Sequence, residues 1–163
     1  MKAIVYTSGT GHTAAYAKLL GEKTGLPVFR LKEAKKLEKG TQIIYMGWLF
    51  ANSVKGYKQA SKWFQIEAVC AVGLCDTGTA VDAVRKANSI CEQVPVFTLQ
   101  GGMDKTRLSG AYRFAINMLI KGLSANKNPT QDDERMLYLL VNDSDYVSEE
   151  NTAAFMQWYD RQK

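Results

Sequence analysis

The sequence has little of what builds disulfide scaffolds, metal centres or catalytic triads. Its 163 residues include three cysteines, three prolines and a single histidine. The cysteines form no CxxC pair, which excludes a disulfide framework and a cysteine-rich zinc module. The lone His12 excludes a histidine-rich metal site and leaves little scope for a nucleophile–histidine–acid triad. We therefore expect no metal site and no catalytic residue pair, and demanding chemistry would have to come from a bound cofactor.

Long apolar runs are also missing. No run approaches the roughly 18 residues that a membrane span needs, and the first residues lack the apolar region and cleavage site of a signal peptide. The composition, 46% hydrophobic and 23% charged, is close to the globular average, which excludes disordered, collagen-like and coiled-coil chains. We expect one cytoplasmic domain over residues 1–163, in which residues 126–163 form a carboxy-terminal extension with a closing helix.

Basic side chains are concentrated at the start of the chain. Residues 1–63 hold 11 basic and 3 acidic side chains, whereas residues 126–163 hold 4 and 8. The simplest interpretation is a set of solvated helix faces. The alternative is a docking surface for an acidic partner or an anionic membrane. No aromatic residues alternate with these lysines, so we expect no nucleic-acid binding. The lysines are Lys32, Lys35, Lys36, Lys39, Lys55, Lys58 and Lys62.

Short apolar runs alternate with amphipathic stretches along the chain. The runs predict buried strands, and apolar spacings of three and four residues predict helices. Strands are expected at residues 2–6, 28–31, 41–46, 68–74 and 94–99. Helices are expected at residues 13–23, 33–38, 54–64, 80–91, 105–123 and 149–159, with loops at 47–53 and 126–133. This alternation predicts an α/β fold: a parallel sheet covered by helices on both faces.

The loop after the first strand has the composition of an anion site. It joins a strand to a helix N-terminus, where free N–H groups and the helix dipole favour negative charge. It lacks the Gly-Lys-Ser/Thr ending of a Walker A loop, so we expect it to hold the terminal monophosphate of a small cofactor. The alternative is an ordinary capped turn. The candidate residues are Ser8, Gly9, Thr10, Gly11, His12 and Thr13.

The same loop satisfies a looser dinucleotide pattern. The segment from Gly9 to Ala14 reads G-x-G-x-x-A, but the acidic residue that would hold a ribose at the end of the second strand is missing. Arg30 and Lys32 stand there instead and suit a 2′-phosphate. An NADP site therefore stays open as an alternative.

Two further loops follow strands at the same edge of the predicted sheet. One contains a tryptophan and a phenylalanine that would stack on a flat ring, although either ring would also serve to pack beneath the loop. The other is small and polar, suited either to the edge of a heteroaromatic ring or to capping the next helix. Its thiol has no neighbouring histidine or lysine in sequence and is expected to be a spectator. The candidate residues are Trp48, Leu49, Phe50, Ala51, Asn52, Cys75, Asp76, Thr77 and Gly78.

Together these three loops resemble those of the flavodoxins. The segment Ser8-Gly9-Thr10-Gly11-His12-Thr13 matches that family's S/T-x-T-G-x-T phosphate loop, and the resemblance covers about residues 1–124. It implies a flavodoxin-like doubly wound sheet of five parallel strands in the order 2-1-3-4-5, of the short-chain type, with no long insertion at the fifth strand. It also implies FMN, with the phosphate on residues 8–13 and the isoalloxazine between residues 48–52 and 75–78.

A narrower resemblance, to the flavodoxin-type protoporphyrinogen dehydrogenases, begins after the fifth strand. It rests on three segments: Gln100-Gly101-Gly102-Met103-Asp104 ahead of a basic helix, Asn128-Pro129-Thr130, and Asp143-Ser144-Asp145-Tyr146. Those proteins pass electrons from a haem precursor through FMN towards the respiratory chain. Their long insertion is not evident here, because the segment after the fifth strand has a simple helical pattern. The basic charge also departs from that of acidic carrier flavodoxins, which favours a membrane-associated or specialised partner.

The expected function is electron transfer through bound FMN, with a redox partner protein or a small-molecule electron donor. The first alternative is a flavin-dependent oxidoreductase of the protoporphyrinogen dehydrogenase type, which needs a cavity beside the ring, walled by residues 100–113. An NADP-binding reductase is more remote, since 163 residues leave little room for a substrate domain. A phosphoacceptor receiver domain is excluded, because the first and third strands end in Thr7-Ser8 and Gly47-Trp48 instead of acidic residues.

Overall fold

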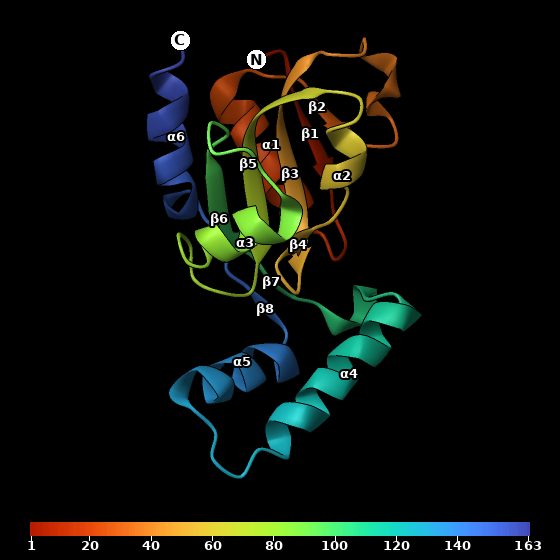
Figure 1. The fold of residues 1–163 in the computed structure, drawn as a ribbon, viewed down its shortest axis with the longest axis vertical. Coiled ribbons are helices and arrows are strands. Elements are labelled where there is room, and N and C mark those ends of the chain that lie inside the picture. The colour runs from red at the N-terminus through yellow and green to blue at the C-terminus, as the bar shows by residue number, and fades with distance from the viewer.

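The computed structural model describes all 163 residues and has an α/β architecture (Figure 1). Its main sheet has five parallel strands in the order β2-β1-β3-β5-β6. Counted along the chain, this is the predicted order 2-1-3-4-5, and the fold is a flavodoxin-like doubly wound sheet. The strands are β1 (Ala3–Thr7), β2 (Val28–Arg30), β3 (Gln42–Phe50), β5 (Gln65–Gly73) and β6 (Val96–Gln100).

Helices cover both faces of the sheet, as predicted. Successive side chains of a strand point to opposite faces. Ile44 and Met46 of β3 therefore join one core, and Ile43 and Tyr45 join the other. The first core lies under α1 (His12–Thr24) and α6 (Ala153–Asp160), and the second under η1 (Ala34–Lys36), α2 (Tyr57–Ala60) and α3 (Val81–Asn88).

The predicted loop at residues 47–53 is wrong, because β3 extends to Phe50. The chain then turns over Ala51 and Asn52 and pairs antiparallel with β4 (Ser53–Val54). Both turn residues have positive φ, 47° and 62°, as the commonest two-residue hairpin turn requires. The aromatic residues of this segment therefore lie on a strand and not on a flexible loop.

The predicted helix over residues 54–64 is also wrong and shrinks to the single turn α2. Val54 is used by the hairpin, and Gly56 adopts φ 83°, which a regular helix does not allow. Gly47 belongs to the same arrangement. A Cβ there would lie 2.5 Å from Val54 Cγ1, so glycine at this position lets the hairpin fold back closely.

The segment after β6 differs most from expectation. The predicted helix over residues 105–123 is broken: a turn, η2 (Lys105–Arg107), precedes α4 (Gly110–Ser124), since Leu108 and Ser109 are extended. α4 does not cover the sheet. It projects away from it beside α5 (Gln131–Val141), as Figure 1 shows. Residues 126–133, predicted as a loop, include the start of α5.

Residues 102–145, which we call the insertion, therefore lie between the last strand and the last helix, where the sequence shows only a simple helical pattern. The insertion begins with β7 (Gly102–Met103) and ends with β8 (Ser144–Asp145), and these two strands pair antiparallel. The chain then passes η3 (Glu150–Thr152) and returns to the sheet as α6, whose Phe155 and Tyr159 are buried in the core with α1.

The insertion has a small core of its own and is tied to the sheet. Met103, Ile116 and Leu140 form a separate apolar cluster. Arg135 of α5 pairs with Asp76 after β5, with Nη2 and Oδ1 2.5 Å apart.

No helix of the chain combines the length and apolarity needed to cross a bilayer.

Candidate functional site

The loop between β1 and α1 is shaped to leave backbone donors free. Ser8 Oγ accepts hydrogen bonds from the N–H groups of Gly11, at 3.2 Å, and Ala14, at 3.4 Å. Gly11 has φ 119°, a backbone conformation that residues other than glycine rarely adopt. The N–H groups of Thr10 and His12 have no partner in the chain. They lie at the N-terminus of a helix, where the dipole favours an anion.

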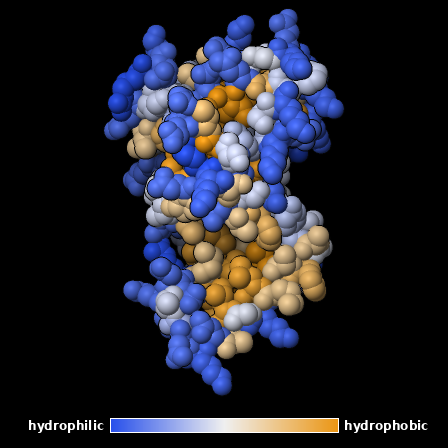
Figure 2. All heavy atoms as spheres, in the orientation of Figure 1, coloured by the Kyte–Doolittle hydropathy of each residue, from blue (hydrophilic) through white to orange (hydrophobic).

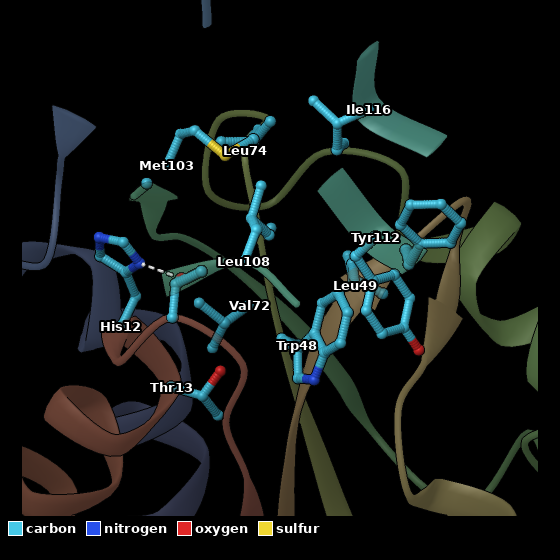
Figure 3. A pocket seen from close by; sticks show the side chains of 14 residues that line it. His12, Thr13, Trp48, Leu49, Val72, Leu74, Met103, Leu108, Tyr112 and Ile116 are labelled. Carbon is cyan, nitrogen blue, oxygen red and sulfur yellow. Dashed lines mark hydrogen bonds between the residues drawn. The ribbon is translucent and has the colours of Figure 1, made fainter. Parts of the chain in front are cut away.

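Thr13 contributes a hydroxyl to the edge of the site. Only 1% of the residue is exposed, but no buried side-chain nitrogen or oxygen of the chain lacks a hydrogen-bond partner, so this hydroxyl is not a buried, unpaired group. Figure 3 shows this hydroxyl directed into a hollow beside the loop. Because this hydroxyl lies beside free N–H groups at a helix N-terminus, the residues of the loop fit a phosphate.

His12 is held between the loop and the insertion. Its Nδ1 lies 3.0 Å from Thr10 Oγ1, and its Nε2 lies 3.9 Å from a carboxylate oxygen of Asp145 in β8. A Cβ on Gly102 would come within 2.8 Å of Nε2. The glycine therefore leaves room for the imidazole, which explains part of the Gln-Gly-Gly segment that the sequence singles out.

Three aromatic rings form the opposite side of the hollow. Trp48 lies against the phosphate loop, since a Cβ on Gly9 would be 3.2 Å from its ring. Tyr112 of α4 packs edge-on against Trp48, with centroids 4.7 Å apart, and against Phe50 at 5.2 Å. Lys55 Nζ lies 5.2–5.9 Å from all three ring centroids. The rings are thus held as one cluster under a cation.

The hollow between the loop and these rings is small and mostly apolar (Figure 3). Its volume is about 80 Å³, below the roughly 300–1,000 Å³ of sites that hold small molecules. Side chains of the insertion fill it from one side. A flat three-ring ligand matches the chemistry of this lining, but its entry requires Tyr112 or the whole of α4 to move. The lining residues are Thr10, His12, Thr13, Trp48, Leu49, Phe50, Val72, Gly73, Leu74, Gly102, Met103, Leu108, Tyr112 and Ile116.

Beyond Leu74, the loop after β5 lies outside this hollow. Thr77 Oγ1 accepts a hydrogen bond from the N–H of Gln100, and the N–H of Gly78 donates to Thr98. Asp76 forms a salt bridge with Arg135. Cys75 and Asp76 both line a separate depression. Burial, followed by the charge of Asp76, raises the pKa of the Cys75 thiol, which makes it a poor nucleophile at neutral pH.

Ala51 and Asn52 also lie away from the hollow. They form the tip of the β3–β4 hairpin, where the carbonyl of Asn52 accepts a hydrogen bond from Asn88 of α3. Of the predicted site residues, the structure thus gathers the phosphate loop with Trp48, Leu49 and Phe50, and leaves the hairpin tip and the third loop apart.

Sequence reasoning named no individual residue of the insertion as part of the site. Tyr112, Leu108 and Met103 line the hollow, and Lys55 covers its aromatic side. The available signal was the apolar face of the helix after the fifth strand. The prediction of a cavity wall at residues 100–113 pointed to the right segment but not to Tyr112 itself.

The site offers binding more than acid–base chemistry. No group of three or more histidine, cysteine, aspartate or glutamate side chains is placed to hold a metal ion, and the hollow itself contains one titratable imidazole, that of His12. What it does offer is an anion loop beside an aromatic wall. No protein-family model, curated protein or solved structure matches the chain.

Proposed function

We propose that the protein binds FMN and transfers electrons through it. The observation that carries this proposal is the loop between β1 and α1, whose free N–H groups at a helix N-terminus lie beside an apolar hollow lined by Trp48. The free N–H groups of Thr10 and His12, with the hydroxyl of Thr13, would hold the phosphate. Trp48 and Phe50 would stack against the ring, and the flavin would supply the electron-carrying chemistry.

One feature favours a second candidate, a flavin-dependent oxidoreductase of the protoporphyrinogen dehydrogenase type. The insertion adds Leu108, Tyr112 and Ile116 as an apolar wall beside the ring site, which a simple electron carrier does not need. An apolar wall suits a large organic substrate, since burial of its surface would contribute to binding. The two candidates share the flavin and differ in the electron donor.

The partner of the electron carrier would be an acidic protein that docks on the basic amino-terminal part of the chain. Lys32, Lys35, Lys36 and Lys39 are exposed around η1, which follows β2 at the edge of the sheet. Clustered positive charge steers an acidic partner and speeds its association. A small-molecule donor would not need this surface.

The phosphate assignment is tested with FMN and riboflavin, which differ only in the phosphate. Replacing Thr10 and Thr13 by alanine is expected to weaken FMN binding by about tenfold to a hundredfold, since the Thr13 substitution removes a hydrogen bond to a charged group. The Thr10 substitution removes the hydroxyl that lies 3.0 Å from His12 Nδ1 within the loop. Riboflavin binding should hardly change. Flavin fluorescence titrations measure both affinities.

Thr24→Ala is the matched control, because its hydroxyl lies at the far end of α1 and donates to the carbonyl of Leu20. Equal loss of FMN and riboflavin affinity in the double variant would point to a disturbed fold. Unchanged FMN affinity would remove the phosphate from this loop. Binding of NADP in place of FMN would favour the reductase alternative.

A further inference from the structure

Helix α4 has an apolar face that no other part of the chain covers. Ala111, Phe114 and Met118 recur at spacings of three and four residues, so they lie on one side of the helix. Phe114 is 69% exposed and Met118 54%. The side that carries Ile116 packs into the insertion instead. Figure 2 shows apolar surface gathered over the half of the molecule that α4 and α5 form.

The charges along this helix have one sign. Residues 105–131 hold five basic side chains and no acidic one. Lys121 lies three residues beyond Met118 and is exposed, and Lys127 is exposed in the turn that follows the helix. The acidic residues that follow α4 in the chain stand at the start of α5, where they suit the dipole of that helix. They are Asp132, Asp133 and Glu134.

An exposed phenylalanine and methionine on a helix whose own charges are all positive fit an anionic lipid surface better than a second copy of the chain. A two-fold contact would bring the same five positive charges opposite one another. A bilayer with acidic lipids offers an apolar interior for the side chains and negative headgroups for the lysines. α4 has 15 residues, about 22 Å of helix, which is too short to span a bilayer but long enough to lie along its surface.

We propose that α4 binds the surface of an anionic lipid bilayer, with Phe114 and Met118 at the boundary between headgroups and acyl chains and Lys121 among the headgroups. This surface belongs to the insertion and is separate from the lysines of residues 32–62. It does not depend on the bound cofactor. Tyr112 lies on the same helix, so the wall of the hollow would lie next to the lipid.

The test is co-sedimentation of the full chain with vesicles of phosphatidylcholine mixed with phosphatidylglycerol, compared with vesicles of phosphatidylcholine alone. Wild-type protein is expected to bind the mixed vesicles more tightly. The double variant Phe114→Ser with Met118→Ser should lower the partition coefficient about tenfold or more, because both side chains leave water on binding. Circular dichroism and urea unfolding check that the variant keeps its fold.

Charge variants separate the two basic surfaces. Lys121→Gln with Lys127→Gln should weaken binding to the mixed vesicles, whereas Lys58→Gln with Lys62→Gln removes the same charge elsewhere and should leave it unchanged. The proposal is overturned if wild-type protein does not bind the mixed vesicles, or if the serine variant binds as wild type does. It is also overturned if the Lys58 and Lys62 variant loses as much binding. A lipid-free dimer that the serine variant converts to a monomer would show that a second copy covers this face.

Discussion

The ring of Tyr112 stands on edge against the ring of Trp48, with centroids 4.7 Å apart and planes inclined by 78°. The two residues come from different parts of the fold, since Trp48 belongs to β3 of the sheet and Tyr112 to α4 of the insertion. This contact closes the hollow beside the phosphate loop. Access to the aromatic wall is therefore governed by the insertion.

Replacing Tyr112 by alanine is expected to speed flavin association. The variant removes a ring that partly fills the site, so less of α4 has to move before a ligand enters. Stopped-flow measurement of flavin fluorescence gives the association rate for wild type and variant. An unchanged or slower rate would mean that Tyr112 does not obstruct entry.

Gly102→Ala is expected to destabilise the protein by roughly 1–3 kcal/mol, the usual cost of overpacking. A Cβ there would meet the carbonyl oxygen of Ser144 in β8 and lie 2.8 Å from His12 Nε2. Gly122→Ala is the matched control, because its Cβ would meet nothing and alanine favours the helix by about 1 kcal/mol. Urea unfolding measures the stability of both variants. Equal changes in the free energy of unfolding would contradict the close packing around Gly102.

Arg107→Ala is expected to lower FMN affinity severalfold while leaving riboflavin affinity unchanged. Arg107 Nη1 donates to the carbonyl oxygen of Thr10 at 3.3 Å, and its Nε lies 3.1 Å from Asp104. The guanidinium thus holds the anion loop and adds positive charge beside it. Arg113→Ala, which removes the same charge from α4, serves as the control. An equal loss of FMN affinity in Arg113→Ala would mean that the effect comes from overall charge and not from the position of Arg107.

Tyr45 predicts a loss of stability at alkaline pH. Burial raises its pKa to about 12, against the opposing hydrogen bond with Thr7. Because the pKa is higher in the folded protein, the neutral phenol stabilises the fold below pH 10, and this contribution is lost as pH rises from 10 to 12. It amounts to roughly 3 kcal/mol.

The control for this pH effect is Tyr45→Phe. The variant loses the hydrogen bond to the carbonyl of Lys55 and should be less stable near neutral pH by about 1 kcal/mol. Its stability should then fall less steeply between pH 10 and 12 than that of wild type. If the urea midpoints of the two proteins fell by the same amount between pH 10 and 12, Tyr45 would not titrate as described.

The central sheet could be predicted from the sequence because local signals and tertiary structure agree there. Runs such as Ala3–Thr7 are apolar, β-branched and bounded by glycine, so their strand character does not depend on distant contacts. The turn between β1 and α1 was predictable for the same reason, since its hydroxyls and glycines are adjacent in sequence.

The hairpin and the insertion were not predictable in this way. Gly47 resembles a strand end, and only the approach of Val54 shows why glycine is needed within β3. The insertion was hidden because α4 carries a good helical pattern. The closing helix over residues 149–159 was predicted and is present as α6, but nothing local shows that α4 does not cover the sheet as well. Tyr112 enters the site through that tertiary arrangement alone.

The visible absorption spectrum of the purified protein, before and after incubation with FMN, tests the central claim most directly. The predicted result is a flavin spectrum with shifted bands. The flavin should stay with the protein on gel filtration, and free riboflavin should displace it less effectively than free FMN does. A colourless protein that leaves the FMN spectrum and fluorescence unchanged would contradict the account, because the anion loop and the aromatic wall would then serve another ligand.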